Sequence, residues 1–306
     1  NTLMTETDAS GVVGTIPPVL GIPFFQAVPY NSVVLDQQEA DSLNQGLATL
    51  NAVYDGMAES SLVPFTEEDR DQRAISYEAG ANPVLIKDPD LEDIGDLFDL
   101  LLSVGEIDEE QRASLEPFRQ ARPMVVDDAA GPELLTLSAA SVLGTLADPN
   151  NPQSQIGVVI PLEPQFHLTA SDIEDIKDRR EKFNEDIIKE VENEARLGIY
   201  DANAPGGSFA DLLGLVDGDE PGIEIQGTIL QPNFIPPNGV FSTDGIHPNS
   251  RGAALLANEF IRAIEETFGA EIPKVDVLRL PSTQICNEDC VSQQGKVVSG
   301  QAQRIL

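Results

Sequence analysis

The chain has 306 residues and an apolar share of 41%, so it can bury the core of one large or two ordinary domains. Its 18 Lys and Arg against 52 Asp and Glu give a formal charge of −34, which excludes nucleic acid and anionic membrane surfaces as partners. We interpret this charge as a means of keeping the protein soluble outside the cell. No run of about 18 apolar residues occurs, so no membrane-spanning segment is predicted.

Residues 1–35 predict the end of a helix followed by one buried core strand. Residues 11–16 are apolar and β-branched, as in a strand covered on both faces, and two prolines end it. Residues just past a parallel strand line the ligand crevice of an α/β fold. Phe24, Phe25 and Tyr30 are therefore candidates for an acyl pocket, with packing beneath a loop as the alternative.

Residues 36–155 predict a mixed, mainly helical segment. Periodic apolar residues indicate helices at 36–59, 90–104 and 108–115. Short β-branched runs indicate strands at 74–86, 124–126 and 134–137. Connections in α/β folds are usually about 2–6 residues long. We therefore expect this segment to be an inserted lid or cap subdomain.

Residues 156–272 predict a return to the core. The expected elements are a strand at 157–162, a helix at 171–197, a strand at 199–203 and a helix at 250–267. Ser171 and Glu174 match a capping box at the start of the first helix. Asp201 and Asn203 end a strand and so lie near the crevice, which makes them candidates for substrate contact.

Residues 273–306 predict a loosely attached tail. Cys286 and Cys290 are the only cysteines, and no further Cys or His lies close enough to complete a metal site. A local disulfide fits an oxidising compartment, and two free thiols are the alternative. We expect no metal ion or cofactor.

The turn from Thr243 to Asn249 carries the chemistry. Gly245 permits a tight turn, and Pro248 holds His247 in an extended or turn conformation. We expect Asn249 to be the N-cap of the helix that follows rather than an oxyanion donor. We expect Asp244 to accept a hydrogen bond from one imidazole nitrogen of His247 and leave the other free to take a proton, as the base half of a Ser-His-Asp triad. The other histidine, His167, has no partner in sequence, and we expect it to be structural.

The pattern Asp244-x-x-His247-Pro248-Asn249-x-x-Gly252, followed by a helix rich in Ala and Leu, resembles the C-terminal catalytic block of the SGNH/GDSL hydrolase family. The resemblance implies a three-layer α/β/α flavodoxin-like core with a parallel sheet. It also implies a serine esterase, lipase or acylhydrolase that needs no cofactor, with Asp244 and His247 as the general-base pair. Residues 11–18 and 183–201 resemble the family's fourth strand and the helix and fifth strand that precede the block.

The family's Gly-Asp-Ser-Leu and Gly-x-Asn-Asp motifs do not occur in this sequence. The nucleophilic serine is expected on a segment preceding Asn1 or on a second chain, or it has been lost. The substrate would be a small-molecule, glycan or lipid ester, and the location extracellular, periplasmic or at a bacterial cell surface, with a lipid anchor on the preceding segment as one option. The alternative function is a non-catalytic binding or assembly subunit on the same fold.

Overall fold

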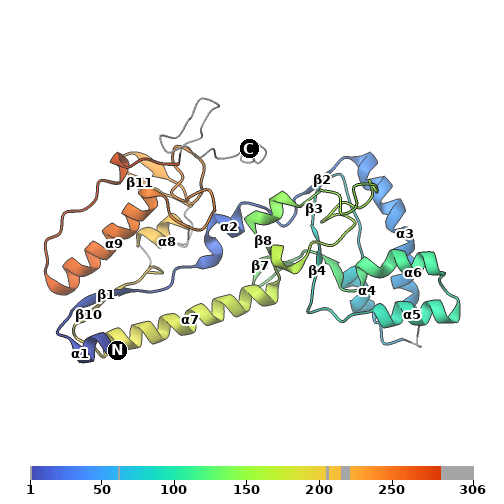
Figure 1. The fold of residues 1–306 in the computed structure, drawn as a ribbon, viewed down its shortest axis with the longest axis horizontal. Coiled ribbons are helices and arrows are strands. Elements are labelled where there is room, and N and C mark those ends of the chain that lie inside the picture. Colours follow the sequence, from blue (N-terminus) through green and yellow to red (C-terminus); the bar gives the residue numbers. More distant parts are fainter. Residues whose placement is uncertain (1, 61–62, 205–206, 215–220, 284–306) are drawn as a thin grey trace. The chain divides into compact units, whose positions relative to one another are not determined.

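The computed structural model describes residues 2–60, 63–204, 207–214 and 221–283. Over these residues the chain is a mixed α/β protein with nine α-helices and several two-stranded sheets, one of them parallel (Figure 1). It divides into two compact units. Unit 1 comprises Asn1–Ala27 and Asp175–Leu306, and unit 2 comprises Val28–Glu174. Within the described residues, every helix is too short or too polar to cross a bilayer.

Unit 1 is organised around the parallel pair of β1 (Gly11–Gly14) and β10 (Leu197–Tyr200). Helix α9 (Ser250–Phe268) packs on this pair, where Tyr200 and Phe260 meet edge to face with ring centroids 5.0 Å apart. Gly198 permits the close approach, since an added Cβ would lie 2.2 Å from the Thr267 hydroxyl oxygen. The other elements of this unit are α1 (Thr2–Glu6), α2 (Pro23–Gln26), α8 (Ser208–Leu212), β11 (Ile223–Ile225), β12 (Thr228–Leu230) and most of α7 (Ala170–Glu192).

Helix α7 differs from its prediction at both ends. Its N-terminal capping bonds are made by Thr169 and Asp172 rather than by Ser171 and Glu174, and the helix ends at Glu192. Only Ile173 is buried. The other apolar side chains of the predicted face are half-buried or exposed, and they are Ile176, Phe183, Ile187, Ile188 and Val191. The described residues therefore cover this face only in part, with Phe183 and Ile188 exposed.

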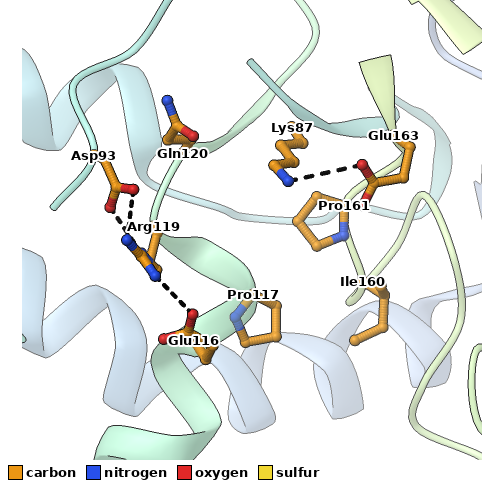
Figure 2. A pocket seen from close by; sticks show the side chains of 9 residues that line it. All are labelled: Lys87, Asp93, Glu116, Pro117, Arg119, Gln120, Ile160, Pro161 and Glu163. Carbon is orange, nitrogen blue, oxygen red and sulfur yellow. Dashed lines mark hydrogen bonds and ion pairs between the residues drawn. The ribbon is translucent and has the colours of Figure 1, made fainter. Parts of the chain in front are cut away.

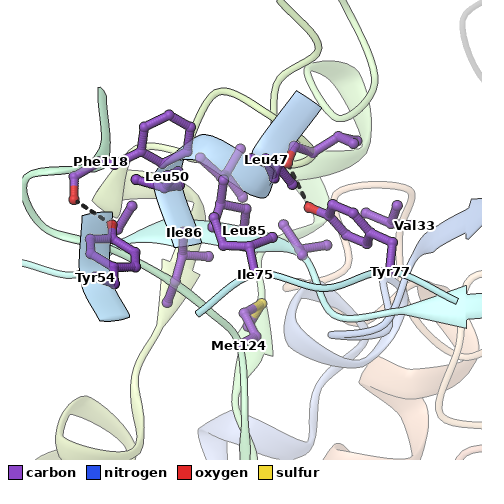
Figure 3. Close-up of a cluster of buried hydrophobic side chains, with 14 of the residues drawn as sticks. Val33, Leu47, Leu50, Tyr54, Ile75, Tyr77, Leu85, Ile86, Phe118 and Met124 are labelled. Atoms are coloured by element: carbon purple, nitrogen blue, oxygen red, sulfur yellow. Dashed lines mark hydrogen bonds between the residues drawn. The ribbon is translucent and has the colours of Figure 1, made fainter. Parts of the chain in front are cut away.

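Unit 2 packs four helices with short antiparallel strand pairs around one hydrophobic core (Figure 1). Its helices are α3 (Gln37–Glu59), α4 (Glu67–Arg73), α5 (Gly95–Val104) and α6 (Glu109–Leu115). Its strands are β2 (Val33–Leu35), β3 (Gly80–Asn82), β4 (Leu85–Lys87), β5 (Ala121–Pro123), β6 (Val126–Asp127), β7 (Gly131–Pro132), β8 (Leu134–Leu135) and β9 (His167–Leu168). In Figure 3, Leu50 and Tyr54 of α3 lie in one cluster with Ile86 of β4, as expected from the apolar spacing of α3.

The bounds of unit 2 differ from the expected 36–155 because flanking segments pair within it. Strand β2 pairs with β3, and β9 pairs with β8. Residues 157–162, expected as a core strand, form turns and isolated bridges, and Val158 and Leu162 lie in the core of unit 2. Unit 2 is thus longer than the insertion predicted at residues 36–155.

The two strands expected within 74–86 do not pair with each other. Residues 74–78 are irregular and bond instead to two asparagine side chains of α3. Asn51 bonds through its amide to both the N–H and the C=O of Ile75, and Asn44 does the same to Tyr77. These amides satisfy backbone groups that would otherwise need a neighbouring strand.

Candidate active site

The Asp244–His247 turn lies immediately before α9 in unit 1 and is closed by the carboxylate of Asp244. Its Oδ1 accepts hydrogen bonds from the backbone N–H groups of Ile246 at 2.9 Å and His247 at 3.0 Å. Its Oδ2 lies 2.7 Å from Nδ1 of His247. Gly245 has a φ of 72°, a left-handed conformation that glycine adopts at little cost. The structure thus brings together the two residues that the sequence predicts as a pair.

The hydrogen bonds to Asp244 keep its carboxyl group ionised. The bond from the His247 side chain, followed by the bond from the Ile246 N–H, lowers the pKa of Asp244 below its ordinary value. An ionised carboxylate can only accept, so Nδ1 of His247 is the donor, and in the neutral imidazole Nε2 then presents the lone pair. The His247 side chain is 75% exposed, and no described residue bonds to Nε2. An approaching hydroxyl group can therefore give its proton to Nε2.

The turn is held in place by the N-terminus of α9. Asn249 is the N-cap, as the sequence indicates: its Oδ1 accepts from the N–H groups of Arg251 and Gly252. Its Nδ2 donates to the carbonyl oxygen of Gly239 at 2.8 Å. Gly252 is required for packing, since an added Cβ would lie 2.3 Å from the carbonyl oxygen of Val240. These contacts explain why Asn249 and Gly252 occupy their positions in the Asp-x-x-His-Pro-Asn-x-x-Gly pattern.

Replacing Asn249 with Ala is expected to lower the free energy of unfolding by about 2 kcal/mol, measured by urea titration. Loss of the cap alone costs about 1 kcal/mol, and the Gly239 carbonyl also loses its donor. Asn249→Ser is the matched control, because serine restores the cap acceptor but not the Nδ2 bonds, so about half of the loss should return. Equal stability of wild type and Asn249→Ala would contradict this assignment.

Two of the predicted pocket residues lie beside the turn. Phe24 and Phe25 are on α2, and the N–H of Phe24 donates to the carbonyl oxygen of Gly245 at 2.9 Å. The two rings pack edge to face with centroids 5.0 Å apart, and both are half-buried. Tyr30, the third predicted residue, belongs to unit 2 and packs against the core of that unit.

Asp201 and Asn203 hold the ends of β1 and β10 together. Oδ1 of Asp201 accepts from the Thr15 hydroxyl at 2.8 Å, and Nδ2 of Asn203 donates to the Ile16 carbonyl oxygen at 3.1 Å. Asn184 of α7 bonds to both the N–H and the C=O of Ile16. The sequence did not indicate Thr15 or Asn184, because their partners lie more than 160 residues away. Oδ1 of Asp201 and Nδ2 of Asn203 are thus used in bonds within the protein, whereas Oδ1 of Asn203 is buried without a partner among the described residues.

The other polar residues that the sequence analysis considered are His167 and the two cysteines. His167 is 3% exposed, and its Nε2 lies 3.0 Å from the Lys87 carbonyl oxygen in unit 2, which fits the structural role expected for it. Burial lowers its pKa, and this disfavours the charged form. Cys286 and Cys290 lie outside the described residues, so their pairing stays a prediction. Within the described ranges, no three His, Cys, Asp or Glu side chains are grouped to hold a metal ion.

A hollow of about 260 Å³ lies in unit 2 and contains none of the predicted site residues (Figure 2). Its charged groups pair with one another: Arg119 with Asp93 and Glu116, and Lys87 with Glu163. No serine, threonine, cysteine or histidine lines this hollow, and its one lysine is paired with Glu163. We therefore place the candidate active site at the Asp244–His247 turn, where the sequence predicts a general base, rather than at the hollow.

Comparisons with known proteins give no support for or against this site, so its assignment depends on the residues described above. Scans against models of protein families, and searches of curated proteins and of solved structures, find no match to this chain.

Proposed function

We propose that the chain supplies the Asp–His half of a Ser-His-Asp ester hydrolase of the SGNH/GDSL type, with the nucleophilic serine on polypeptide outside residues 1–306. One observation carries the proposal: Oδ2 of Asp244 lies 2.7 Å from Nδ1 of His247, while the imidazole is 75% exposed. The pair thus has the geometry of a general base and is open to a reactant. Among the described residues, no hydroxyl or thiol bonds to His247.

We also propose that β1 and β10 belong to a larger parallel sheet with helices on both faces. Parallel strands occur almost only in sheets that are covered on both sides, and a two-stranded sheet is marginal alone. The N–H groups of Gly11 and Thr15 donate to the carbonyl oxygens of Arg196 and Tyr200, so the N–H groups of Val12 and Gly14 point to the opposite edge of β1. No described strand pairs with that edge. The partly covered apolar face of α7 also fits additional strands. Both features favour the three-layer core that the family resemblance implies.

In the proposed mechanism, the serine Oγ attacks the ester carbonyl carbon while its proton passes to Nε2 of His247. The carbonyl π pair moves onto oxygen, and Asp244 stabilises the imidazolium that forms. Collapse of this intermediate breaks the bond to the alcohol, which leaves with the proton from Nε2. Water then attacks the acyl-serine in the same way, giving the carboxylic acid and the free serine.

The test uses the full-length protein, including any polypeptide that precedes Asn1, and a fluorophosphonate probe that reacts with activated serines. Wild type is expected to be labelled on one serine, and labelling should fall at least 100-fold in His247→Ala. An unlabelled wild type, or equal labelling of the variant, would reject the hydrolase. The non-catalytic binding subunit would then be the better explanation of the fold.

A further inference from the structure

Helix α2 is bonded to the Asp244–His247 turn at the residue between its two reactive side chains. The N–H of Phe24 lies in the first turn of α2, where it has no partner within the helix. It donates instead to the carbonyl oxygen of Gly245. Pro23, at the start of the helix, is buried. The aromatic residues of α2 are therefore held next to the general base.

The two segments joined by this bond carry three large apolar side chains that lie outside the hydrophobic clusters of the described residues. Ile246 lies between Asp244 and His247 in the chain and is 45% exposed. The half-buried rings of Phe24 and Phe25 pack on each other, and neither they nor Ile246 belong to the hydrophobic clusters of the described residues. Apolar groups exposed together beside a reactive group are typical of a ligand site.

The two joined segments of unit 1 are uncharged, in contrast to the strongly negative chain as a whole. Residues 9–27 and 225–243 contain no Asp, Glu, Lys or Arg, although 23% of the chain is charged. The bond from Phe24 to Gly245 brings the first stretch to the end of the second. An apolar, uncharged surface next to the base favours a neutral, apolar group over a charged or strongly hydrated one.

We propose that Phe24, Phe25 and Ile246 bind the acyl chain of the substrate, and that this substrate is a neutral ester of a medium-chain fatty acid rather than an acetyl ester. The proposal rests on the proposed hydrolase function, because it takes His247 as the reaction centre. Each methylene that leaves water improves binding about fourfold. A six-carbon acyl chain should therefore bind far better than a two-carbon chain.

The first experiment measures binding on the chain itself. The chain has two histidines, so the Hε1 protons give two NMR signals, which His247→Gln assigns. Methyl hexanoate is expected to shift the His247 signal with at least tenfold higher affinity than methyl acetate, and to leave the His167 signal in place. The double variant Phe24→Ala with Phe25→Ala should weaken methyl hexanoate binding at least tenfold. Val275→Ala, at an exposed apolar residue of unit 1 outside both uncharged segments, is the matched control and should bind as wild type does.

Equal affinity for the two esters would overturn the proposal, as would unchanged binding in the double variant. An unshifted ester-free His247 signal in that variant verifies that the turn is intact. A second experiment separates this proposal from the hydrolase itself, using p-nitrophenyl hexanoate and acetate with the full-length protein. If turnover depends on His247 but the double variant still prefers the hexanoate ester, the acyl site is rejected and the hydrolase is retained. Phe24-dependent binding without any turnover would reject the hydrolase and leave the apolar site in place.

Discussion

Replacing His247 with Ala in the full-length protein is expected to lower kcat/KM for p-nitrophenyl hexanoate by at least about a thousandfold. The variant removes the group that accepts the serine proton, and the other histidine of the chain is buried in unit 2. The side chain is largely exposed, so the free energy of unfolding should change by less than about 1 kcal/mol. Stopped assays over a range of substrate concentrations give the loss, and urea titration gives the stability.

One outcome would contradict the prediction for His247→Ala. Turnover within about threefold of wild type, with the variant folded, would show that hydrolysis does not use this imidazole. His247→Gln is the matched control for shape, because it keeps a polar side chain of similar reach but cannot accept and return the proton. Both variants should therefore be equally inactive.

Replacing Asp244 with Asn is expected to lower kcat by about 10⁴-fold while the turn stays folded. The amide keeps an oxygen for the N–H groups of Ile246 and His247, but its nitrogen can now face Nδ1 as a donor. Nδ1 would then become the acceptor, and Nε2 would carry a proton and lose its function as a base. Steady-state kinetics provide the measurement.

Asp276→Asn is the matched control for Asp244→Asn. Asp276 is likewise a partly exposed carboxylate of unit 1 that bonds to the side chain three residues on, in this case Arg279. Its substitution should leave kcat within about twofold of wild type, as expected for a surface pair of little energetic weight. Equal losses in the two variants would assign the effect of Asp244→Asn to lost surface charge rather than to the orientation of His247.

The pKa of Asp244 is expected to lie below the ordinary aspartate value of about 3.9 and to rise part of the way back in His247→Ala. The variant removes the largest cause of the shift, and the two backbone donors remain. Since the folded pKa is the lower one, the stabilisation from this carboxylate is complete above about pH 5 and is lost as the pH falls through the folded pKa. Carboxyl ¹³C NMR titration measures both values, and equal values in the two proteins would contradict the assigned cause.

Local sequence signals predicted the part of the structure that carries the site. The Asp-x-x-His spacing, Gly245 and the cap at Asn249 act within a few residues of one another, so their arrangement follows from turn and helix-end chemistry. Helix α3 was predicted for the same reason, because its apolar residues recur at helical spacing. The bond between Asp244 and His247 is thus a local structure that sequence reasoning can anticipate.

The parts that the sequence did not predict depend on distant contacts. The run at residues 157–162 has the composition of a buried strand, yet its apolar residues are buried by turns against β4. The irregular segment at Ile75 and Tyr77 is satisfied by asparagines of α3, and no propensity scale records such a bond. The contact between Phe24 and Gly245 likewise joins segments far apart in the chain. Burial and partner choice at long range are outside the reach of local patterns.

The tautomer of His247 is the most direct test of the account, because the attack by serine and the attack by water both need an unprotonated Nε2. With only two histidines in the chain, ¹⁵N NMR of the imidazole nitrogens resolves both rings at neutral pH. We predict a proton on Nδ1 of His247 and a lone pair on Nε2, and a loss of this preference in Asp244→Asn. A proton on Nε2 in the wild-type chain, unaffected by the Asp244 substitution, would contradict the assignment of His247 as the general base.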